Sequence, residues 1–201
     1  MMIIAPPWVD YREQIITVIL ENGVTSIGGN AFYDCSSLTS VTIPDSVTSI
    51  GDETFSGCSS LTSVTIPDSV VSIPVSAFNF CDSLERINVA EKNPYYCNDA
   101  QGVLYNKKGT ILLKCPGAYS GEYNIPAGVT TVNNGAFQYC NWLTSVTIPD
   151  SVRRIGSDAF FCCGSLTSVI IPDSVTSIGY CAFANCSSLT SITIPDSVTS
   201  I

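Results

Sequence analysis

Cysteine is the residue type in this chain with the greatest capacity for chemistry. The 201 residues include 10 cysteines and no histidine. Six cysteines occupy one repeated position, close to repeated Phe and Leu positions: Cys35, Cys58, Cys81, Cys140, Cys163 and Cys186. Thiols stacked in this way lie within reach of disulfides by distance alone, but free cysteine is also among the most buried residue types. We predict that this column consists of reduced, packed thiols.

The other four cysteines lie outside the column: Cys97, Cys115, Cys162 and Cys181. Cys97 and Cys115 flank an inserted segment and are the pair best placed for a disulfide. The lack of histidine and of any Cys-x-x-Cys pair excludes a conventional zinc finger or ribbon. A cysteine-only site could use Cys162, Cys163, Cys181 and Cys186, but we expect no metal ion.

Aspartate forms a second column, directly after a proline in five of the eight repeats: Asp45, Asp68, Asp150, Asp173 and Asp196. Stacked carboxylates can bind calcium, whereas the ordinary role of Asp after Pro is to accept hydrogen bonds within a turn. The missing histidine removes the usual general base, and no GxSxG, phosphate-loop or HExxH string occurs. We therefore predict a non-catalytic chain that uses no cofactor.

The charge and hydropathy of the chain limit the kinds of molecule that it can bind. The chain has 8 basic and 17 acidic residues, for a formal net charge of -9. Nucleic acid and anionic membrane surfaces would be repelled at long range. No apolar run approaches the roughly 18 residues of a membrane helix, and the first residues lack the basic region of a secretion signal. We expect neither a membrane span nor a signal peptide in this chain.

A 23-residue repeat positions all of these columns. The string VTIPDSVTSIG begins at Val41 and again at Val64. The apolar residue at the same place in each repeat gives eight anchors: Leu20, Ile43, Ile66, Val89, Ile125, Ile148, Ile171 and Ile194. Every interval is 23 residues except that from Val89 to Ile125, which is 36. An insertion of 13 residues therefore interrupts the repeats.

Each repeat predicts a strand, a turn, a short extended stretch and a short helical turn. In residues 38–43 (LTSVTI) apolar residues alternate with Ser and Thr, as in a half-buried strand. Pro44-Asp45-Ser46 then ends the strand. The apolar spacing through Phe55 and Cys58 suits one helical or 3₁₀ turn. Such a unit cannot bury its apolar face alone, so we expect one strand per repeat, stacked in parallel into a solenoid.

The insertion has its own pattern. Residues 102–115 (GVLYNKKGTILLKC) predict two strands around a Lys-Lys-Gly turn, and we expect this hairpin to project from the solenoid. Tyr95, Tyr96 and Tyr105 supply aromatic side chains of the kind enriched in binding hot spots. The same tyrosines could instead fill the gap between the two coils on either side. The residues leave both interpretations open.

The repeating unit L-x-x-V-x-I-P-x-x-V-x-x-I-G-x-x-A-F-x-x-C-x-x, visible from Leu38 onward, resembles the BspA-like class of leucine-rich repeats, which is related to the treponemal type. The resemblance covers about residues 15 to 201. It implies a right-handed solenoid and a bacterial surface protein, with relatives in mucosal protozoa, that adheres to host extracellular-matrix proteins and other cells. The segment 99–116 is similar to insertions that interrupt the repeats of such proteins.

These observations together predict an α/β solenoid, a right-handed leucine-rich-repeat rod of 23-residue coils. We expect a parallel β-sheet on one face, short helical turns and an inserted β-hairpin. One domain would cover residues 1–201: a lead-in at 1–14, N-terminal repeats at about 15–89, the irregular repeat at 90–120, and C-terminal repeats at 121–201 without a polar cap.

The expected function is that of a protein-binding repeat module, an adhesin-like fragment at the cell surface or secreted, that binds host or extracellular-matrix proteins. Candidate contact residues lie on the outward strand positions and in the insertion: Arg86, Asn88, Tyr95, Tyr96, Tyr105, Lys107, Lys108, Glu122, Asn124, Ser145 and Thr147. One alternative is a structural spacer that associates end to end through its last coil. Another is ice binding through the Ser/Thr strand face.

Overall fold

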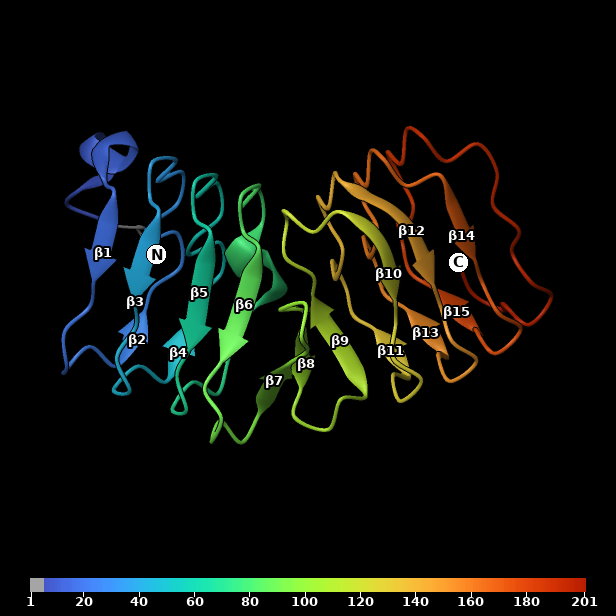
Figure 1. Cartoon of the computed structure of the whole chain (residues 1–201), viewed down its shortest axis with the longest axis horizontal. Coiled ribbons are helices and arrows are strands. Elements are labelled where there is room, and N and C mark those ends of the chain that lie inside the picture. The colour runs from blue at the N-terminus through green and yellow to red at the C-terminus, as the bar shows by residue number, and fades with distance from the viewer. Residues whose placement is uncertain (1–5) are drawn as a thin grey trace.

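The alternating Ser/Thr and apolar residues form a strand in successive coils of the computed structural model, which describes residues 6–201 (Figure 1). These strands are β1 (Thr17–Ile19), β3 (Ser40–Thr42), β5 (Ser63–Ile66), β6 (Arg86–Val89), β10 (Gly121–Asn124), β12 (Leu143–Thr147) and β14 (Ser168–Ile170). They lie on one side of the molecule, here called the strand face. Pairing is parallel, β1 with β3, β5 with β6, β10 with β12, and β12 with β14. The predicted solenoid is confirmed.

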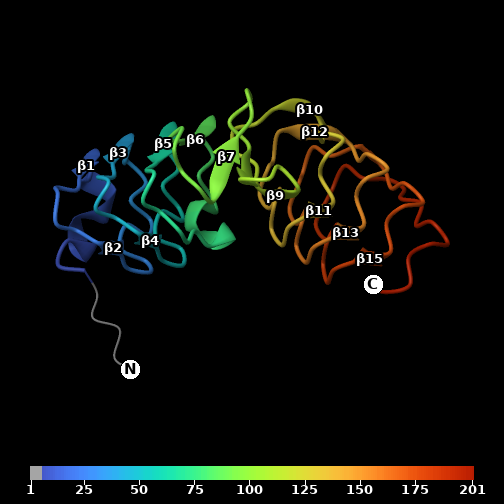
Figure 2. The same cartoon turned by 90° about the horizontal axis from the view of Figure 1, so that it is seen from below.

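A second series of short strands follows the turns that end the strands of the strand face. It consists of β2 (Ser26–Ile27), β4 (Ser49–Ile50), β11 (Thr131–Val132), β13 (Arg154–Ile155) and β15 (Ser177–Ile178). Figure 2 shows the labelled strands of this series below those of the strand face. The expectation of one strand per repeat was therefore incomplete. The extended residues after each turn face the equivalent residues one coil away, so they pair in register.

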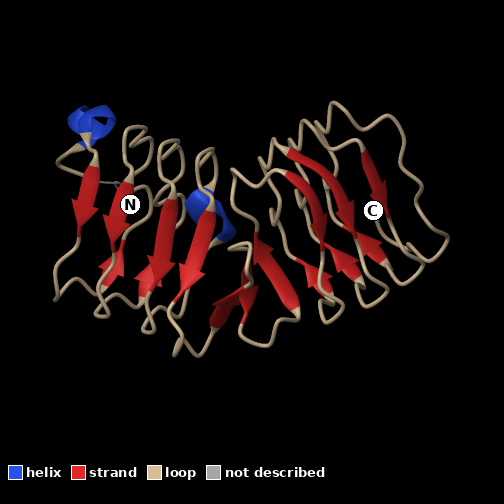
Figure 3. Ribbon diagram, viewed as in Figure 1, coloured by secondary structure: helices blue, strands red, loops and turns tan. Residues whose placement is uncertain are grey.

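Helical structure is scarcer than an α/β solenoid implies. Residues 6–201 contain two 3₁₀ helices, η1 (Val9–Gln14) and η2 (Val75–Phe78), and no α-helix (Figure 3). The other coils pass the Phe and Cys positions in hydrogen-bonded turns such as Cys58 N–H to the Phe55 carbonyl, at 3.1 Å. Residues spaced three apart suffice for a turn of this kind but not for a longer helix.

The core is divided into two clusters. One runs from Val18 to Leu104 and the other from Val103 to Cys186. Aromatic rings stack through each cluster with centroids 4.9 to 5.8 Å apart: Trp8, Phe32, Phe55 and Phe78, and then Phe137, Phe160 and Phe183. Trp8 ends the first stack, where its indole N–H also donates to the Ala31 carbonyl at 2.8 Å. The lead-in therefore covers the first coil.

The insertion is built into the solenoid. It forms β7 (Tyr96–Asn98), β8 (Leu104–Asn106) and β9 (Ile111–Lys114). β8 pairs with β7 and β9 in antiparallel fashion, as the hairpin prediction required, but β9 also pairs in parallel with β11. The expectation that the hairpin projects was wrong. Leu104 and Leu112 are buried, because the irregular repeat must supply the core residues that a regular coil would supply.

Candidate functional site

The candidate contact residues fall on two surfaces. Six lie on the strand face, in neighbouring strands: Arg86 and Asn88 in β6, Glu122 and Asn124 in β10, and Ser145 and Thr147 in β12. Arg86, Glu122, Asn124 and Thr147 are exposed, whereas Asn88 and Ser145 are half-buried. The others come from the insertion, below the strand face in the view of Figure 1. The junction between β6 and β10, where the irregular repeat lies, is called the seam.

At the seam the insertion replaces a strand beside β6. The Ile87 N–H donates to the Gly102 carbonyl at 3.0 Å, and the Val89 N–H donates to the Asn98 Oδ1 at 2.8 Å. The Arg86 guanidinium donates to the Ala100 carbonyl at 2.9 Å. A side chain at Gly102 would place its Cβ 2.7 Å from the Arg86 Cα, and the φ of Gly102 is +80°. Glycine therefore permits the turn to lie against β6.

A carboxylate and two phenols hold the other side of the seam. The Tyr123 hydroxyl donates to the Asp99 carboxylate at 2.6 Å. The Tyr105 hydroxyl contacts the Tyr123 hydroxyl and lies 3.5 Å from the same carboxylate oxygen, so its single proton is donated to one of these two acceptors. Burial raises the pKa of both phenols, so they remain protonated donors. Tyr105 is 4% exposed, so its assignment to a contact surface was wrong, and it fills the gap between coils.

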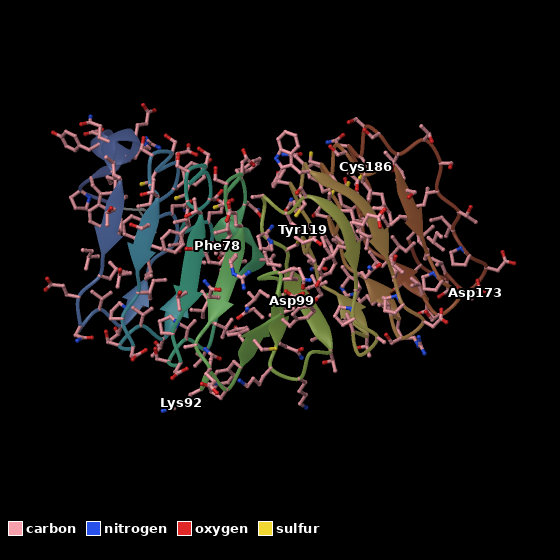
Figure 4. All side chains as sticks on the ribbon, viewed as in Figure 1. Phe78, Lys92, Asp99, Tyr119, Asp173 and Cys186 are labelled. Carbon is pink, nitrogen blue, oxygen red and sulfur yellow. The ribbon has the colours of Figure 1, made fainter. Side chains whose placement is uncertain are left out.

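A hollow of about 190 Å³ opens beside this cluster. Its lining is Cys97, Asn98, Asp99, Tyr105, Gly109 and Pro126. Asp99 lies near the middle of the molecule in Figure 4, between the two halves of the strand face. The carboxylate is already occupied by hydroxyl and backbone donors, since the N–H groups of Gln101 and Val103 each lie 2.9 Å from Oδ1. The polar group that lines the hollow, the Asp99 carboxylate, therefore already has hydrogen-bond donors within the protein.

The second surface is the lower edge of the insertion. Tyr95 is 50% exposed, and Lys107 and Lys108 are exposed in the turn between β8 and β9. The Lys107 N–H donates to the Tyr95 carbonyl at 2.7 Å, which fixes the turn beside the tyrosines. The half-buried Tyr96 donates its hydroxyl to the Val71 carbonyl at 3.1 Å. Lys107, Lys108, Tyr95 and Tyr96 thus lie together, apart from the strand-face candidates.

All ten cysteines are free, and the six column thiols are buried as predicted. Most of the column thiols donate to the Phe carbonyl one coil earlier, at 3.0 to 3.2 Å: Cys58 to Phe32, Cys81 to Phe55, Cys163 to Phe137 and Cys186 to Phe160. Burial raises the pKa of Cys58 and Cys81. These thiols are consequently poor nucleophiles.

The Cys97–Cys115 disulfide is not formed. The Cys97 Sγ donates to the Asn106 carbonyl at 3.3 Å, whereas Cys115 is fully buried beside Cys140. Cys115 therefore extends the thiol column through the irregular repeat, which the interrupted 23-residue step concealed. Among residues 6–201 no group of three or more Cys, Asp or Glu side chains is arranged to hold a metal ion.

A buried lysine at the seam was not predicted. The Lys114 ammonium donates to the Asn79 Oδ1 at 2.9 Å, the Gly135 carbonyl at 3.2 Å and the Gln138 carbonyl at 3.3 Å. It thereby joins the last coil before the insertion to the first coil after it. Burial lowers the pKa of this ammonium. The alternation in residues 111–114 places Lys114 on the same side as the buried Leu112, a signal that was available in the sequence.

The chain belongs to the family described as BspA type leucine rich repeat region. Six copies of the family model match, over residues 10–101 and 119–201. The unmatched residues between these ranges contain β8, β9 and the turn that joins them. No curated protein matches the chain. Repeats of this family are generally non-catalytic.

Solved structures of bacterial proteins resemble the chain. A leucine rich cell surface protein from Faecalibacterium prausnitzii A2-165 is 36% identical, with a TM-score of 0.81 over 92% of this chain and 49% of that chain. The pneumococcal vaccine antigen PcpA is 26% identical, with a TM-score of 0.85 over 92% of this chain and 46% of that chain. The T. pallidum leucine rich repeat protein is also 26% identical, with a TM-score of 0.55 over 88% of this chain and 78% of that chain.

This chain spans about half the length of the first two of these relatives. In residues 6–201 no helix has the length and apolar character that crossing a bilayer requires.

Proposed function

We propose that this chain is a non-catalytic protein-binding module, at the cell surface or secreted, whose contact surface is the strand face around the seam. The observation that carries this proposal is the placement of Arg86, Asn88, Glu122 and Asn124. These four side chains replace the Ser/Thr consensus, and they flank the junction between β6 and β10, where the irregular repeat interrupts the strand face. Departures from consensus that the fold does not require are where partner choice can be encoded.

The relatives support the class of partner. One is described as a leucine rich cell surface protein and another as a vaccine antigen, and both descriptions are compatible with a module at the cell surface or secreted. We infer that this module binds a host or extracellular-matrix protein. Ser145 and Thr147, next to β10, would extend the contact surface along β12.

The alternative function is a structural spacer, and one observation favours it. Many consensus hydroxyls are engaged in holding coils together, for example Thr48 to the Thr25 carbonyl at 3.1 Å and Thr167 to the Thr144 carbonyl at 3.1 Å. A spacer would need these bonds and the contact of Arg86 with the Ala100 carbonyl, and nothing from the side chains of Asn88, Glu122 and Asn124.

Binding of the purified chain to immobilised fibronectin and fibrinogen tests the proposal. The variant R86S/N88T/E122S/N124T restores the consensus at no change in net charge. A matched control, Glu21→Ser with Arg154→Ser, also removes one acid and one base at exposed positions away from the seam. We expect saturable binding that weakens at least roughly tenfold in the first variant alone.

Circular dichroism must show that both variants fold. Saturable binding that is equal in the chain and both variants would move the contact away from the seam. Absence of saturable binding to both matrix proteins would remove the support for a matrix partner and favour the spacer.

A further inference from the structure

Lysine is distributed unevenly in this chain. It has four lysines, of which Lys114 is buried, and the other three lie in or next to the insertion: Lys92, Lys107 and Lys108. All three are exposed. Turns of the regular coils carry an Asp and no Lys: Asp45, Asp68, Asp150, Asp173 and Asp196. Glu91 holds the place of this Asp in the turn that contains Lys92. Figure 4 shows Lys92 and Asp173 on the same lower edge of the molecule. A positive segment therefore interrupts an acidic edge.

The positive segment is held in a defined conformation. The buried Asn93 donates to the Pro67 carbonyl at 2.7 Å and to the Val70 carbonyl at 3.1 Å. Its Oδ1 accepts from the N–H groups of Tyr95 and Tyr96 at 2.8 and 2.9 Å. The segment that follows Lys92 is thus fixed to the preceding coil. Side chains carried by a fixed backbone lose less entropy when they bind a partner.

A hollow of about 270 Å³ lies inside this segment. Its lining includes Tyr96, Asn98, Glu91 and Lys107. The Lys107 ammonium donates to the Glu91 backbone carbonyl at 3.2 Å, so it is held at the hollow by a neutral acceptor. Glu91 is the acidic member of the lining, against the charges of Lys92, Lys107 and Lys108 nearby. The local balance is positive, in a chain with a net charge of -9.

We propose that the basic edge, made of Lys92, Tyr95, Tyr96, Lys107 and Lys108, binds an acidic segment of a protein partner. The proposal rests on the protein-binding function above and adds the chemistry of the partner. Ammonium groups would pair with Asp or Glu carboxylates, and the Tyr95 ring would supply apolar contact area. The hollow has the size for one side chain of the partner.

The charge of the rest of the molecule adds selectivity. An acidic segment is repelled by the Asp turns on both sides and attracted by the three lysines of the insertion, whereas the exposed Arg153 and Arg154 lie beside Asp150. Repulsion from wrong positions and attraction at one position together fix where the partner docks. The insertion thus turns an otherwise anion-repelling edge into one anion-binding site.

The test uses the full chain and a fluorescein-labelled peptide of about ten residues, mostly glutamate with one tyrosine, at low and high salt. K107E/K108E should weaken peptide binding at least roughly tenfold, and Tyr95→Ala should weaken it several-fold. The matched pair Lys108→Glu and Arg154→Glu changes net charge equally at two exposed positions. Only Lys108→Glu should lower the affinity clearly.

Equal losses of peptide affinity in Lys108→Glu and Arg154→Glu would show that binding responds to net charge alone, and would overturn the proposal. So would failure of the chain to bind the peptide. Binding of a heparin oligosaccharide but not of the peptide, lost in K107E/K108E, would assign the basic edge to sulfated glycans instead. If K107E/K108E keeps its binding to fibronectin or fibrinogen, the seam function stands while the acidic-segment proposal fails.

Discussion

Single hydroxyl groups hold consecutive coils together at the Pro-Asp-Ser turn. Four serines of this position donate to a carbonyl 22 residues earlier, at 2.6 to 2.8 Å: Ser46, Ser69, Ser151 and Ser197. Ser174 is the exception, since its buried hydroxyl has no hydrogen-bond partner in the described chain. The carbonyl 22 residues before it, that of Val152, instead accepts from the Arg153 guanidinium at 3.3 Å. Arg153 stands where other repeats have Thr.

Arg153→Thr should therefore stabilise the protein by about 1 kcal/mol, because Ser174 gains the Val152 carbonyl and the buried hydroxyl is satisfied. Urea denaturation measures the change. Arg154→Ser removes the same charge from an exposed neighbour and should leave the midpoint nearly unchanged. An equal shift in both variants would attribute the effect to charge and not to Ser174.

The thiol column makes stability dependent on alkaline pH. Burial raises the pKa of Cys81 from 9.0 to about 12, although the nearby Lys114 opposes this shift. The folded chain thus keeps a proton that the unfolded chain loses above about pH 9. The contribution of this thiol to stability is complete below pH 9 and is lost as the pH rises toward 12.

Cys81→Ala should flatten the decline of unfolding free energy above pH 9 by up to about 1.4 kcal/mol per pH unit. Urea denaturation under reducing conditions at several pH values measures the slope. Leu84→Ala, at a buried position that cannot titrate, should lower stability at every pH and keep the original slope. The same slope in Cys81→Ala and the parent chain would contradict the assignment.

Residue columns were the most predictable feature at this scale. Burial of Cys58 and Cys81 follows from their fixed step beside Phe and Leu, because identical positions must stack. The step fails within the insertion, so neither Cys115 nor Lys114 could be assigned to the column or the seam by counting. Tyr105 shows the same limit, since aromatic residues serve cores and contact surfaces equally well.

At the scale of elements, turn chemistry predicted the hairpin and packing decided its position. The Lys-Lys-Gly turn and the alternation on either side correctly indicated β8 and β9. A hairpin projects from the solenoid or packs within it according to whether a neighbouring strand pairs with it and buries its apolar side chains. The pairing of β9 with β11 answers that question and involves residues outside the hairpin. Local patterns carry no information about such a partner.

Asn93 is the side chain that anchors this element, with two donors and one acceptor atom in use. Asn93→Asp would turn a carboxylate oxygen toward the Pro67 and Val70 carbonyls, where no proton can satisfy them at neutral pH. We expect a loss of about 2 to 3 kcal/mol in unfolding free energy, together with weaker peptide binding at the basic edge. Thermal denaturation and the peptide titration measure the two effects.

Asn124→Asp is the control for this substitution, since it adds the same charge at an exposed strand position. It should change stability by less than about 0.5 kcal/mol. A similar small effect of Asn93→Asp would mean that the insertion does not depend on this anchor.

The whole molecule consists of two cores that meet at the seam. Lys114 reaches Asn79 on one side and Gly135 and Gln138 on the other. The Phe80 and Tyr139 rings also stack across this junction, with centroids 3.8 Å apart. Contacts of this kind make two stacks of coils unfold together, as nearest-neighbour coupling in repeat proteins requires.

Lys114→Ala should destabilise the chain by about 3 kcal/mol, since it leaves the Asn79 Oδ1 and the Gln138 carbonyl unpaired and a void behind. It should also separate the unfolding of the two halves. Trp8 reports on the first core and Trp142 on the second, so fluorescence of the two single-tryptophan variants resolves them. Lys108→Ala should keep a single transition. Coincident transitions in Lys114→Ala would place the coupling elsewhere.

The bonds between coils connect equivalent places on neighbouring units, as in Thr48 to the Thr25 carbonyl and Thr176 to the Arg153 carbonyl. If a gene lost or duplicated one 23-residue unit, each donor would still meet an equivalent acceptor. The rod could then shorten or lengthen in steps of about 4.8 Å without any new interface. The irregular repeat differs from both neighbours and cannot be copied in this way. The length of the rod can therefore change by whole repeats while the irregular repeat, beside the proposed contact residues, stays the same.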